Sequence, residues 1–521
     1  MAARLAPLVT VLLLTVLALG VRLNGLDWRD GDLSTDEARI GLAANGVLTT
    51  GLSMLPSGGG RLYTRGLVTI YATAPSLALF GVHDWAARLP SILAGALLVP
   101  AIFLLTREVA GTVPALAAAA FVVFAGPLVA WSRQAWPPAM FLLLFTLAAF
   151  AAVRGFVRDV PRWQLWAALG FLLTLLAYEM ALILPAGLCL YLAMRALRRD
   201  LGWWQGRWTL AAVVVAGLAL GIEAGMGLAL RAGTLAGADA EFRHYFTPAL
   251  RLSGVSYYWR QVWDGALPLL LLVPVAIASA RLGRRSLPPG LGLLLALLVV
   301  ALLVPTLIIQ TKQEQQYGLA VLPLTAALWA WALAALAGRL PSGASTSRSM
   351  NLRQSDVLVA AAVGLLSFGI VLGGDVADAL RPRTPSRSPT WLDDLRARGY
   401  PAGEADPLVL AEAPLGTQLY LGQADFYIHP EGFERYAYQD GPVARSIYTP
   451  AILLKQAGDF ERLVSGPYAG RTLWIIGQDD RLPRLTRQME PALWQRLQAA
   501  SGVTRPTRGW WIMRVQLPLA P

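Results

Sequence analysis

Long apolar runs recur along this chain of 521 residues and constrain its fold more than any other feature. A helix needs about 20 apolar residues to cross the hydrocarbon core of a bilayer. Hydrophobic residues make up 56% of the chain and charged residues 15%, so an ordinary soluble globular protein is excluded. The sequence predicts an α-helical polytopic membrane protein. Its about eleven transmembrane helices are expected near 5–22, 89–106, 112–131, 138–157, 164–179, 181–197, 208–230, 262–280, 287–309, 317–338 and 356–373.

Basic residues gather in alternate loops between these runs. Short cytoplasmic loops are enriched in Lys and Arg, so the side of each loop can be predicted from its charge. With a cytoplasmic N-terminus, every inside loop contains arginine, as at Arg107, Arg158, Arg198, Arg284 and Arg339. We therefore expect a multi-pass protein of the cell (inner) membrane, with loop 23–88 and the chain after 373 outside the cytoplasm.

The remaining composition narrows the class of protein. The net charge of +12 is typical of cytoplasmic loops that face lipid headgroups. Nucleic-acid binding is not predicted, because the sequence has no basic stripe with interleaved aromatic residues. The single cysteine, Cys189, excludes an internal disulfide framework. The run that begins at Leu5 is long for a signal peptide and has no clear cleavage site, so a retained helix is predicted.

Three regions follow from these patterns. Residues 1–373 are predicted to form the transmembrane domain, and a Pro- and Ser-rich linker covers 374–390. An extracytoplasmic α/β domain is predicted over 391–521. Its strands are expected at 407–414, 425–430, 472–477 and 510–517, and its helices at 450–464 and 491–500. No internal repeat supports an inverted-repeat transporter.

The first outer loop, 23–88, contains a helix-start signal. Ser34 followed three residues later by Glu37 has the form of a capping box, with Thr35 as the first helical residue. The apolar face of 38–48 predicts a helix along the membrane surface. Capping gives Glu37 a structural task and leaves Asp36 available for chemistry, although Asp36 could simply complement the helix dipole.

Acidic residues cluster just before this helix. Asp27, Asp30, Asp32 and Asp36 lie at the mouth of a membrane helix, where carboxylates are costly unless a cation or a reaction uses them. The spacing does not match an EF-hand. His83 lies beside Asp84, and we expect a histidine satisfied by that neighbour.

Three segments carry a family resemblance. They are DEARIGLAANGVL with the RLYTRGLVTIYATAPSLALFG that follows it, AWSRQAWPPAMFLLLF, and EQQYGLAVLPLTAAL. Their order and topology over residues 5–340 resemble GT-C membrane glycosyltransferases, especially the lipid A aminoarabinose transferases and the protein O-mannosyltransferases. The resemblance implies an inverting transfer of a sugar from a polyprenyl-phosphate donor to a hydroxyl group of a lipid, glycan or protein acceptor.

The resemblance and the predicted outer loops together suggest roles for single residues. The aspartate of the family's Asp-Glu motif corresponds to Asp36, the expected general base. Expected cations for the donor phosphate are Arg65, Arg133 and Lys312. Candidate contacts to the sugar or the acceptor are Glu37, Tyr63, Glu179, Tyr258 and Tyr317.

The chain departs from the family pattern at three positions. Thr64 stands where relatives carry a glutamate associated with metal binding, Gly66 replaces a proline, and Trp136 replaces an arginine. No cofactor is therefore certain, and a divalent metal held by Asp30, Asp32 and Asp36 is left open.

Two other functions remain open on the sequence alone. A transporter or flippase for lipid-linked material would use ionisable residues within spans, and Glu223 and Asp264 are the candidates. The other is an inactive scaffold whose outer domain binds a partner. Arg88, at the start of a span, is expected to be structural.

Overall fold

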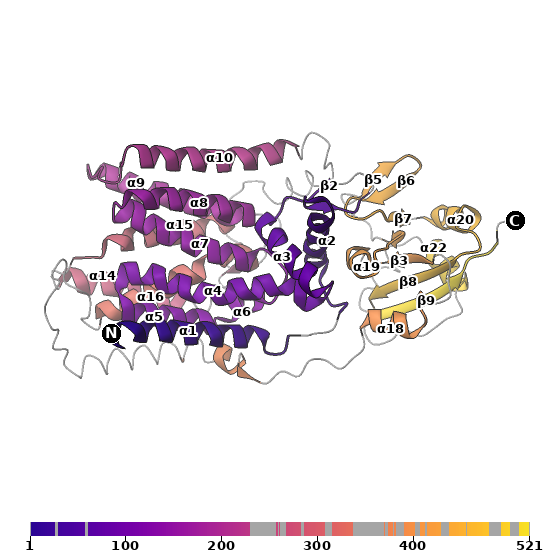
Figure 1. The fold of residues 1–521 in the computed structure, drawn as a ribbon, viewed down its shortest axis with the longest axis horizontal. Helices are drawn as coiled ribbons and strands as arrows, with labels where there is room; N and C mark the ends of the chain where they lie inside the picture. The colour runs from indigo at the N-terminus through magenta and orange to yellow at the C-terminus, as the bar shows by residue number, and fades with distance from the viewer. Residues whose placement is uncertain are drawn as a thin grey trace. The chain divides into compact units, whose positions relative to one another are not determined.

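A computed structural model describes most of the chain in two compact units (Figure 1). The helical unit comprises Met1–Leu26, Pro90–Gly225 and His244–Arg383, and the mixed unit comprises Asp27–Leu89, Met226–Arg243 and Thr384–Pro521. The described residues are 2–26, 30–57, 61–229, 257–258, 260, 267–282, 286–307, 315–336, 369, 374–378, 380–381, 390–401, 407–411, 414–428, 437–454, 456–478, 491–500 and 510–519.

The helical unit consists of long apolar helices packed around one hydrophobic core. Its helices are α1 (Ala2–Leu23), α4 (Asp84–Ala110), α5 (Thr112–Phe124), α6 (Gly126–Ser132), α7 (Pro138–Ala152), η1 (Val153–Val157), α8 (Pro161–Ala177), η2 (Glu179–Leu182), α9 (Ile183–Leu197), α10 (Arg207–Ala229), α13 (Leu267–Leu270), α14 (Leu272–Leu282), α15 (Pro289–Leu307), η5 (Gln315–Gly318) and α16 (Val321–Leu336). Residues 84–89 of α4 belong to the mixed unit.

The predicted fold class is confirmed. Among the described residues, seven helices are long and apolar enough to cross a membrane, or eight if α5 and α6 form one bent span. Helices occupy ten of the predicted spans, but α8 and α14 are shorter than a full span, with 17 and 11 residues. Nearly all of the predicted span 356–373 lies outside the described residues. The protein is therefore a multi-pass membrane protein, with fewer full-length spans described than predicted.

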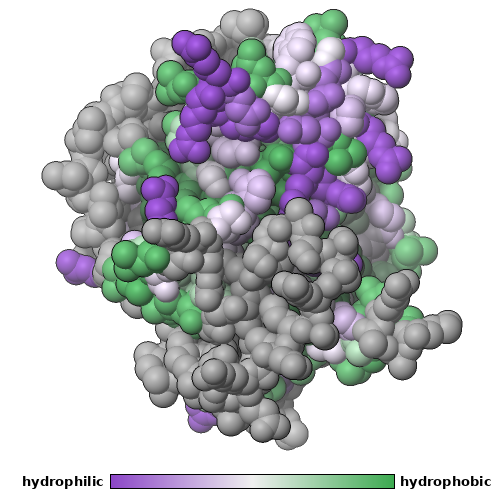
Figure 2. Space-filling view, turned by 90° about the vertical axis from the view of Figure 1, so that its left-hand side faces the viewer, coloured by the Kyte–Doolittle hydropathy of each residue, from purple (hydrophilic) through white to green (hydrophobic). Residues whose placement is uncertain are grey.

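The loops expected in the cytoplasm lie together. The N-terminus and the chain segments after α4, α7 and α9 are at one end of the helical unit (Figure 1). Figure 2 looks onto that end and shows hydrophilic residues gathered over part of it. Arg158, Arg198 and Arg199 are exposed. The alternation of loops agrees with the predicted topology, and which end faces the cytoplasm stays a prediction.

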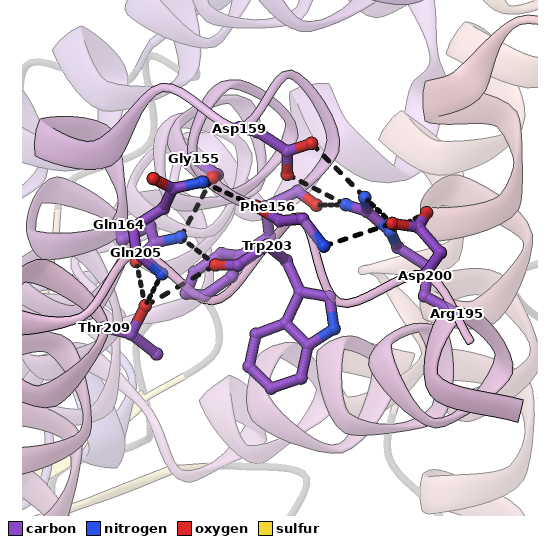
Figure 3. Close-up of polar contacts among 10 residues, drawn as sticks. Gly155, Phe156, Asp159, Gln164, Arg195, Asp200, Trp203, Gln205 and Thr209 are labelled. Atoms are coloured by element: carbon purple, nitrogen blue, oxygen red, sulfur yellow. Dashed lines mark hydrogen bonds and ion pairs between the residues drawn. The ribbon is translucent and has the colours of Figure 1, made fainter. Parts of the chain in front are cut away.

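A polar network joins two of these loops (Figure 3). Arg195 forms ion pairs with Asp159 and Asp200, at 2.9 and 2.7 Å. Beside it, the amide of Gln164 donates to the carbonyls of Gly155 and Trp203, at 3.2 and 2.6 Å. These bonds fix the turn after η1 against the turn before α10.

Gln164→Leu is expected to destabilise the helical unit. Gln164 is fully buried, and its loss leaves two backbone carbonyls short of a donor, at a cost of about 1–3 kcal/mol. The thermal unfolding midpoint in detergent should fall. Gln205→Leu is the matched control, because the Gln205 amide donates to Gly202 near the surface. Equal midpoints for Gln164→Leu and wild type would contradict the network's structural role.

The break between α5 and α6 has a physical cause. Pro127 has no backbone N–H to continue the helix, and the two helices meet at an angle of 59°. The carbonyls released at the end of α5 accept hydrogen bonds from the buried guanidinium of Arg22, at 3.3 Å from Val122 and 3.4 Å from Val123. The carboxylate of Asp375 accepts a hydrogen bond from the amide of Gly126 at 2.7 Å.

The mixed unit contains an α/β sandwich. Within the described residues its sheet has seven strands in the order β5-β6-β7-β4-β3-β8-β9. Strands β7, β4, β3 and β8 are parallel, and the outer strands are antiparallel. The strands are β3 (Leu408–Ala411), β4 (Phe426–Ile428), β5 (Ala437–Asp440), β6 (Val443–Ser446), β7 (Ile452–Leu454), β8 (Thr472–Gln478) and β9 (Trp510–Gln516).

Helices cover both faces of this sheet. Alternate residues of β3 point to opposite faces, so Leu410 packs in one core and Val409 in the other. Helices α20 (Ala457–Ser465) and α22 (Pro491–Ala500) cover the first face. Helices α18 (Trp391–Ala397) and α19 (Pro414–Leu421) pack on the other face, with Val409.

Most of the predicted elements of this domain are found. All four predicted strands coincide with β3, β4, β8 and β9, and the helix predicted over 491–500 is α22. The helix predicted over 450–464 is wrong in its first half, where β7 forms. The apolar run there completes the edge of the parallel sheet, and sheet pairing overrides helical spacing.

Loop 23–88, which is predicted to lie outside the cytoplasm, folds into the same unit from Asp27 onward. It contains α2 (Thr35–Thr50), the hairpin of β1 (Met54–Leu55) and β2 (Arg61–Leu62), and α3 (Leu67–Phe80). Helix α19 packs on α2, where the absence of a side chain at Gly41 accommodates Leu419. Trp391 donates to the carbonyl of Gly31 at 2.9 Å, and Tyr420 bonds Asp84.

Gly46→Ala is expected to destabilise this loop. A Cβ at Gly46 would lie 2.0 Å from the carbonyl oxygen of Met54, so β1 would have to move away from α2. Overpacking of this kind costs about 1–3 kcal/mol. Limited proteolysis should cleave the hairpin faster than in wild type. Gly416→Ala is the control, because open space surrounds its Cβ position; equal cleavage of all three proteins would contradict the tight packing.

Candidate active site

Helix α2 separates the two neighbouring carboxylates as the sequence predicts. The capping box is present: Ser34 Oγ accepts from the amide of Glu37, and the Glu37 carboxylate accepts from the amide of Ser34 at 3.0 Å. Glu37 also forms an ion pair with Arg88, whose Nε lies 2.8 Å from Oε1. The side chain of Glu37 is 5% exposed, and its ion pair gives Arg88 a structural partner.

Asp36 has a different environment. Its side chain is 48% exposed, and Oδ1 lies 3.5 Å from Nη1 of Arg39, one helical turn later. Arg39 is buried and lies over the rings of Tyr448 and Tyr63, at 4.3 and 5.8 Å from the ring centres. A solvent-accessible carboxylate beside a buried guanidinium can accept a proton from an incoming hydroxyl group.

Tyr63 lies at the centre of this group. Burial raises the pKa of Tyr63, while the positive charges of Arg39 and Arg65 lower it and the negative charge of Asp36 raises it. Asp36 and Arg65, two other predicted residues, are thus both near enough to Tyr63 for their charges to affect it. Arg65 lies in the turn before α3, next to Gly66, whose φ of +77° suits glycine.

The acidic stretch before α2 is held by hydrogen bonds. Asp30 accepts from Nδ1 of His83 at 2.8 Å and from the amide of Asp84, and Asp84 accepts from the amides of Gly31 and Asp32. The partner of His83 is therefore Asp30, and the expectation of Asp84 was wrong, because Asp84 turns back to cap the loop.

The side chains of Asp30 and Asp84 are engaged in these hydrogen bonds, and the described acidic side chains do not converge on one point. In the part of the chain that the structure describes, no three His, Cys, Asp or Glu side chains converge on a point that could hold an ion. Asp30, Asp32 and Asp36, for which the sequence left a metal site open, do not form such a group. Asp27 lies outside the described residues.

The remaining predicted residues belong to the helical unit. Arg133, at the end of α6, donates to the carbonyl of Gly25 at 2.9 Å. Glu179 begins η2, directly after Tyr178, and the ring of Tyr178 stacks on that of Tyr317 with centroids 6.1 Å apart. Tyr258 is fully buried. Lys312 and Asp264 lie outside the described residues. The roles of these residues in binding stay predictions.

Sequence reasoning missed Arg39 and the buried Arg22. The signal for Arg39 was its spacing, because a residue three positions after Asp36 lies on the same side of a helix. The signal for Arg22 was its position as a basic residue at the C-terminal end of the first apolar run.

Comparison with solved structures settles the fold. ArnT from Cupriavidus metallidurans, bound to undecaprenyl phosphate, superposes with a TM-score of 0.62 and 16% identity, over 98% of this chain and 99% of that one. AglB from Archaeoglobus fulgidus, in complex with an inhibitory peptide and a dolichol-phosphate, superposes with a TM-score of 0.52 and 12% identity, over 95% and 72%. The chain has the GT-C glycosyltransferase fold.

Sequence comparison points the same way. The dolichyl-phosphate-mannose-protein mannosyltransferase family matches residues 64–222, which begin at the turn of Arg65 and end in α10. No curated protein matches the chain by sequence. The GT-C match confirms the resemblance drawn from the sequence and extends it, because the superposition with ArnT also covers the C-terminal domain.

Proposed function

We propose that this protein is an inverting glycosyltransferase that moves a sugar from a polyprenyl-phosphate donor to a hydroxyl group of an acceptor. The observation that carries the proposal is the group formed by Asp36, Arg39, Tyr63 and Arg65 on the first outer loop of a GT-C fold. An exposed carboxylate and basic side chains in one place supply the two things that this displacement needs.

The residues take the following parts. The carboxylate of Asp36 removes the proton of the acceptor hydroxyl, whose oxygen attacks the anomeric carbon. The bond from that carbon to the phosphate oxygen breaks, and its electron pair stays on the lipid phosphate. We assign Arg65, Arg133 and Lys312 to the phosphate, because guanidinium and ammonium groups stabilise the charge that develops there. Tyr63, Glu37, Glu179, Tyr258 and Tyr317 stay candidate contacts to sugar or acceptor.

The location of the reaction is part of the proposal. Arginine-rich loops lie at the end of the helical unit that also carries the N-terminus, which supports a cytoplasmic N-terminus. Loop 23–88 and the C-terminal domain would then face outward from the inner membrane. The C-terminal domain, tethered there, would help to present the acceptor.

A panel of undecaprenyl-phosphate sugars tests the function. The purified protein is reconstituted in vesicles that contain a membrane lipid extract as acceptor, and released undecaprenyl phosphate is quantified for each sugar. We expect release with one or a few sugars, accompanied by transfer of the sugar to an acceptor. Translocation of the intact donor without release would instead indicate a flippase.

A further inference from the structure

One aromatic ring of the C-terminal domain contacts the guanidinium next to the proposed base. Tyr448 lies in the turn between β6 and β7, and its ring centre is 4.3 Å from Cζ of Arg39. Tyr448 is 8% exposed. A guanidinium over an aromatic face is attracted to the ring, and most strongly where the pair is desolvated. The ring therefore restricts where the Arg39 guanidinium can lie.

The turn that carries Tyr448 is held firmly. Ser446 Oγ accepts hydrogen bonds from the amides of Tyr448 and Thr449, at 3.2 and 3.3 Å. Arg445 donates to the carbonyl of Pro450 at 2.9 Å, and the amide of Ser446 donates to Ala451 at 2.9 Å. With both ends bonded, the turn presents the Tyr448 ring in a fixed place.

The guanidinium on the other side of this contact leads directly to the proposed base. Arg39 Nη1 lies 3.5 Å from Oδ1 of Asp36. The side chain of Arg39 is 7% exposed and that of Asp36 is 48% exposed, so the buried guanidinium restrains a carboxylate that otherwise faces solvent. Reacting groups must be held within fractions of an ångström of their productive positions, because small misplacements lower the rate strongly.

We propose that Tyr448 is a positioning residue, which orients Asp36 through Arg39. The C-terminal domain then contributes to the chemical step as well as to acceptor presentation. This inference rests on the proposed function, because it requires Asp36 to be the base.

The test compares Tyr448→Leu, which removes the ring, with Tyr448→Phe, which keeps the ring face. With the donor that the panel identifies, Tyr448→Leu should lower kcat about tenfold and leave the KM for the donor unchanged. Tyr448→Phe should keep at least about half of the wild-type kcat, since the ring face makes the contact. Tyr438→Leu is the matched control, a Tyr-to-Leu change on β5, and should match wild type.

A double-mutant cycle separates positioning from general stability. Arg39→Gln alone should lower kcat by at least as much as Tyr448→Leu. Adding Tyr448→Leu to Arg39→Gln should cause no further loss, because the contact is already absent. Binding of undecaprenyl phosphate, used as a probe of the folded helical unit, should be equal in all variants. If Tyr448→Leu prevents folding, kcat and KM are measured for Tyr448→Met instead and judged in the same way.

Two results would overturn the inference. One is a wild-type kcat in Tyr448→Leu. The other is that Tyr448→Leu lowers kcat as much in the Arg39→Gln background as it does alone. Asp36→Asn in the same assay distinguishes the two levels of the argument. If Asp36→Asn keeps full activity, the proposed function fails; if only Tyr448→Leu keeps it, the positioning role fails alone.

Discussion

Asp36→Asn is expected to lower the rate of sugar transfer by about 10²–10⁴-fold. The substitution keeps the size of the side chain and removes its ability to take a proton. Asp36 is 48% exposed, and its side chain caps no backbone amide in the described structure. The Asp36→Asn variant should therefore fold normally. The rate is measured as release of undecaprenyl phosphate from the donor that the panel identifies.

The comparison needs a carboxylate of similar exposure elsewhere. Glu461 on α20 is 54% exposed, and Glu461→Gln removes one negative charge from the same unit. This control should keep the wild-type rate, and both variants should keep the wild-type unfolding midpoint. A loss of less than about threefold in Asp36→Asn would remove Asp36 from the chemistry.

Arg88→Met is expected to have the largest effect on stability. The Glu37 carboxylate is 5% exposed and receives two hydrogen bonds from Arg88, at 2.8 and 3.1 Å. Removing one partner of a buried ion pair leaves an uncompensated charge and costs about 3–5 kcal/mol. The mixed unit should lose its protease resistance, and the yield of folded protein should fall sharply.

A second substitution shows whether the charge is the cause. Adding Glu37→Gln to Arg88→Met removes the buried charge, so part of the lost stability should return. Arg398→Met, which changes an arginine outside the pair, should behave like wild type. If Arg88→Met is as stable as wild type, the ion pair is not what holds the start of α4 to α2.

The sequence allowed the local features of the site to be predicted. The capping box at Ser34 depends on residues three positions apart, so the start of α2 and the separate environments of Asp36 and Glu37 follow from a short window. The apolar runs likewise predict the helices, because a span is a property of one continuous segment. The parallel strands β3 and β8 were recognisable as short buried apolar runs between turn residues.

Features that depend on long-range pairing were missed. Nothing near Tyr448 in the sequence indicates that its ring meets Arg39, more than 400 positions earlier. The expected partner of His83 was its neighbour, whereas Asp30 is brought to it by the fold of the loop. The first half of 450–464 became β7 because a sheet edge was available to pair with it. In each case the deciding contact is tertiary.

A donor with two labels tests the central claim most directly. The sugar carries one radioisotope and the undecaprenyl phosphate another, and both are followed in vesicles with wild-type protein and with Asp36→Asn. We predict that wild-type protein separates the labels, with the sugar label on an acceptor and the lipid label as undecaprenyl phosphate, and that Asp36→Asn leaves them joined. Labels that stay joined in the wild type while the donor crosses the bilayer would contradict a transferase.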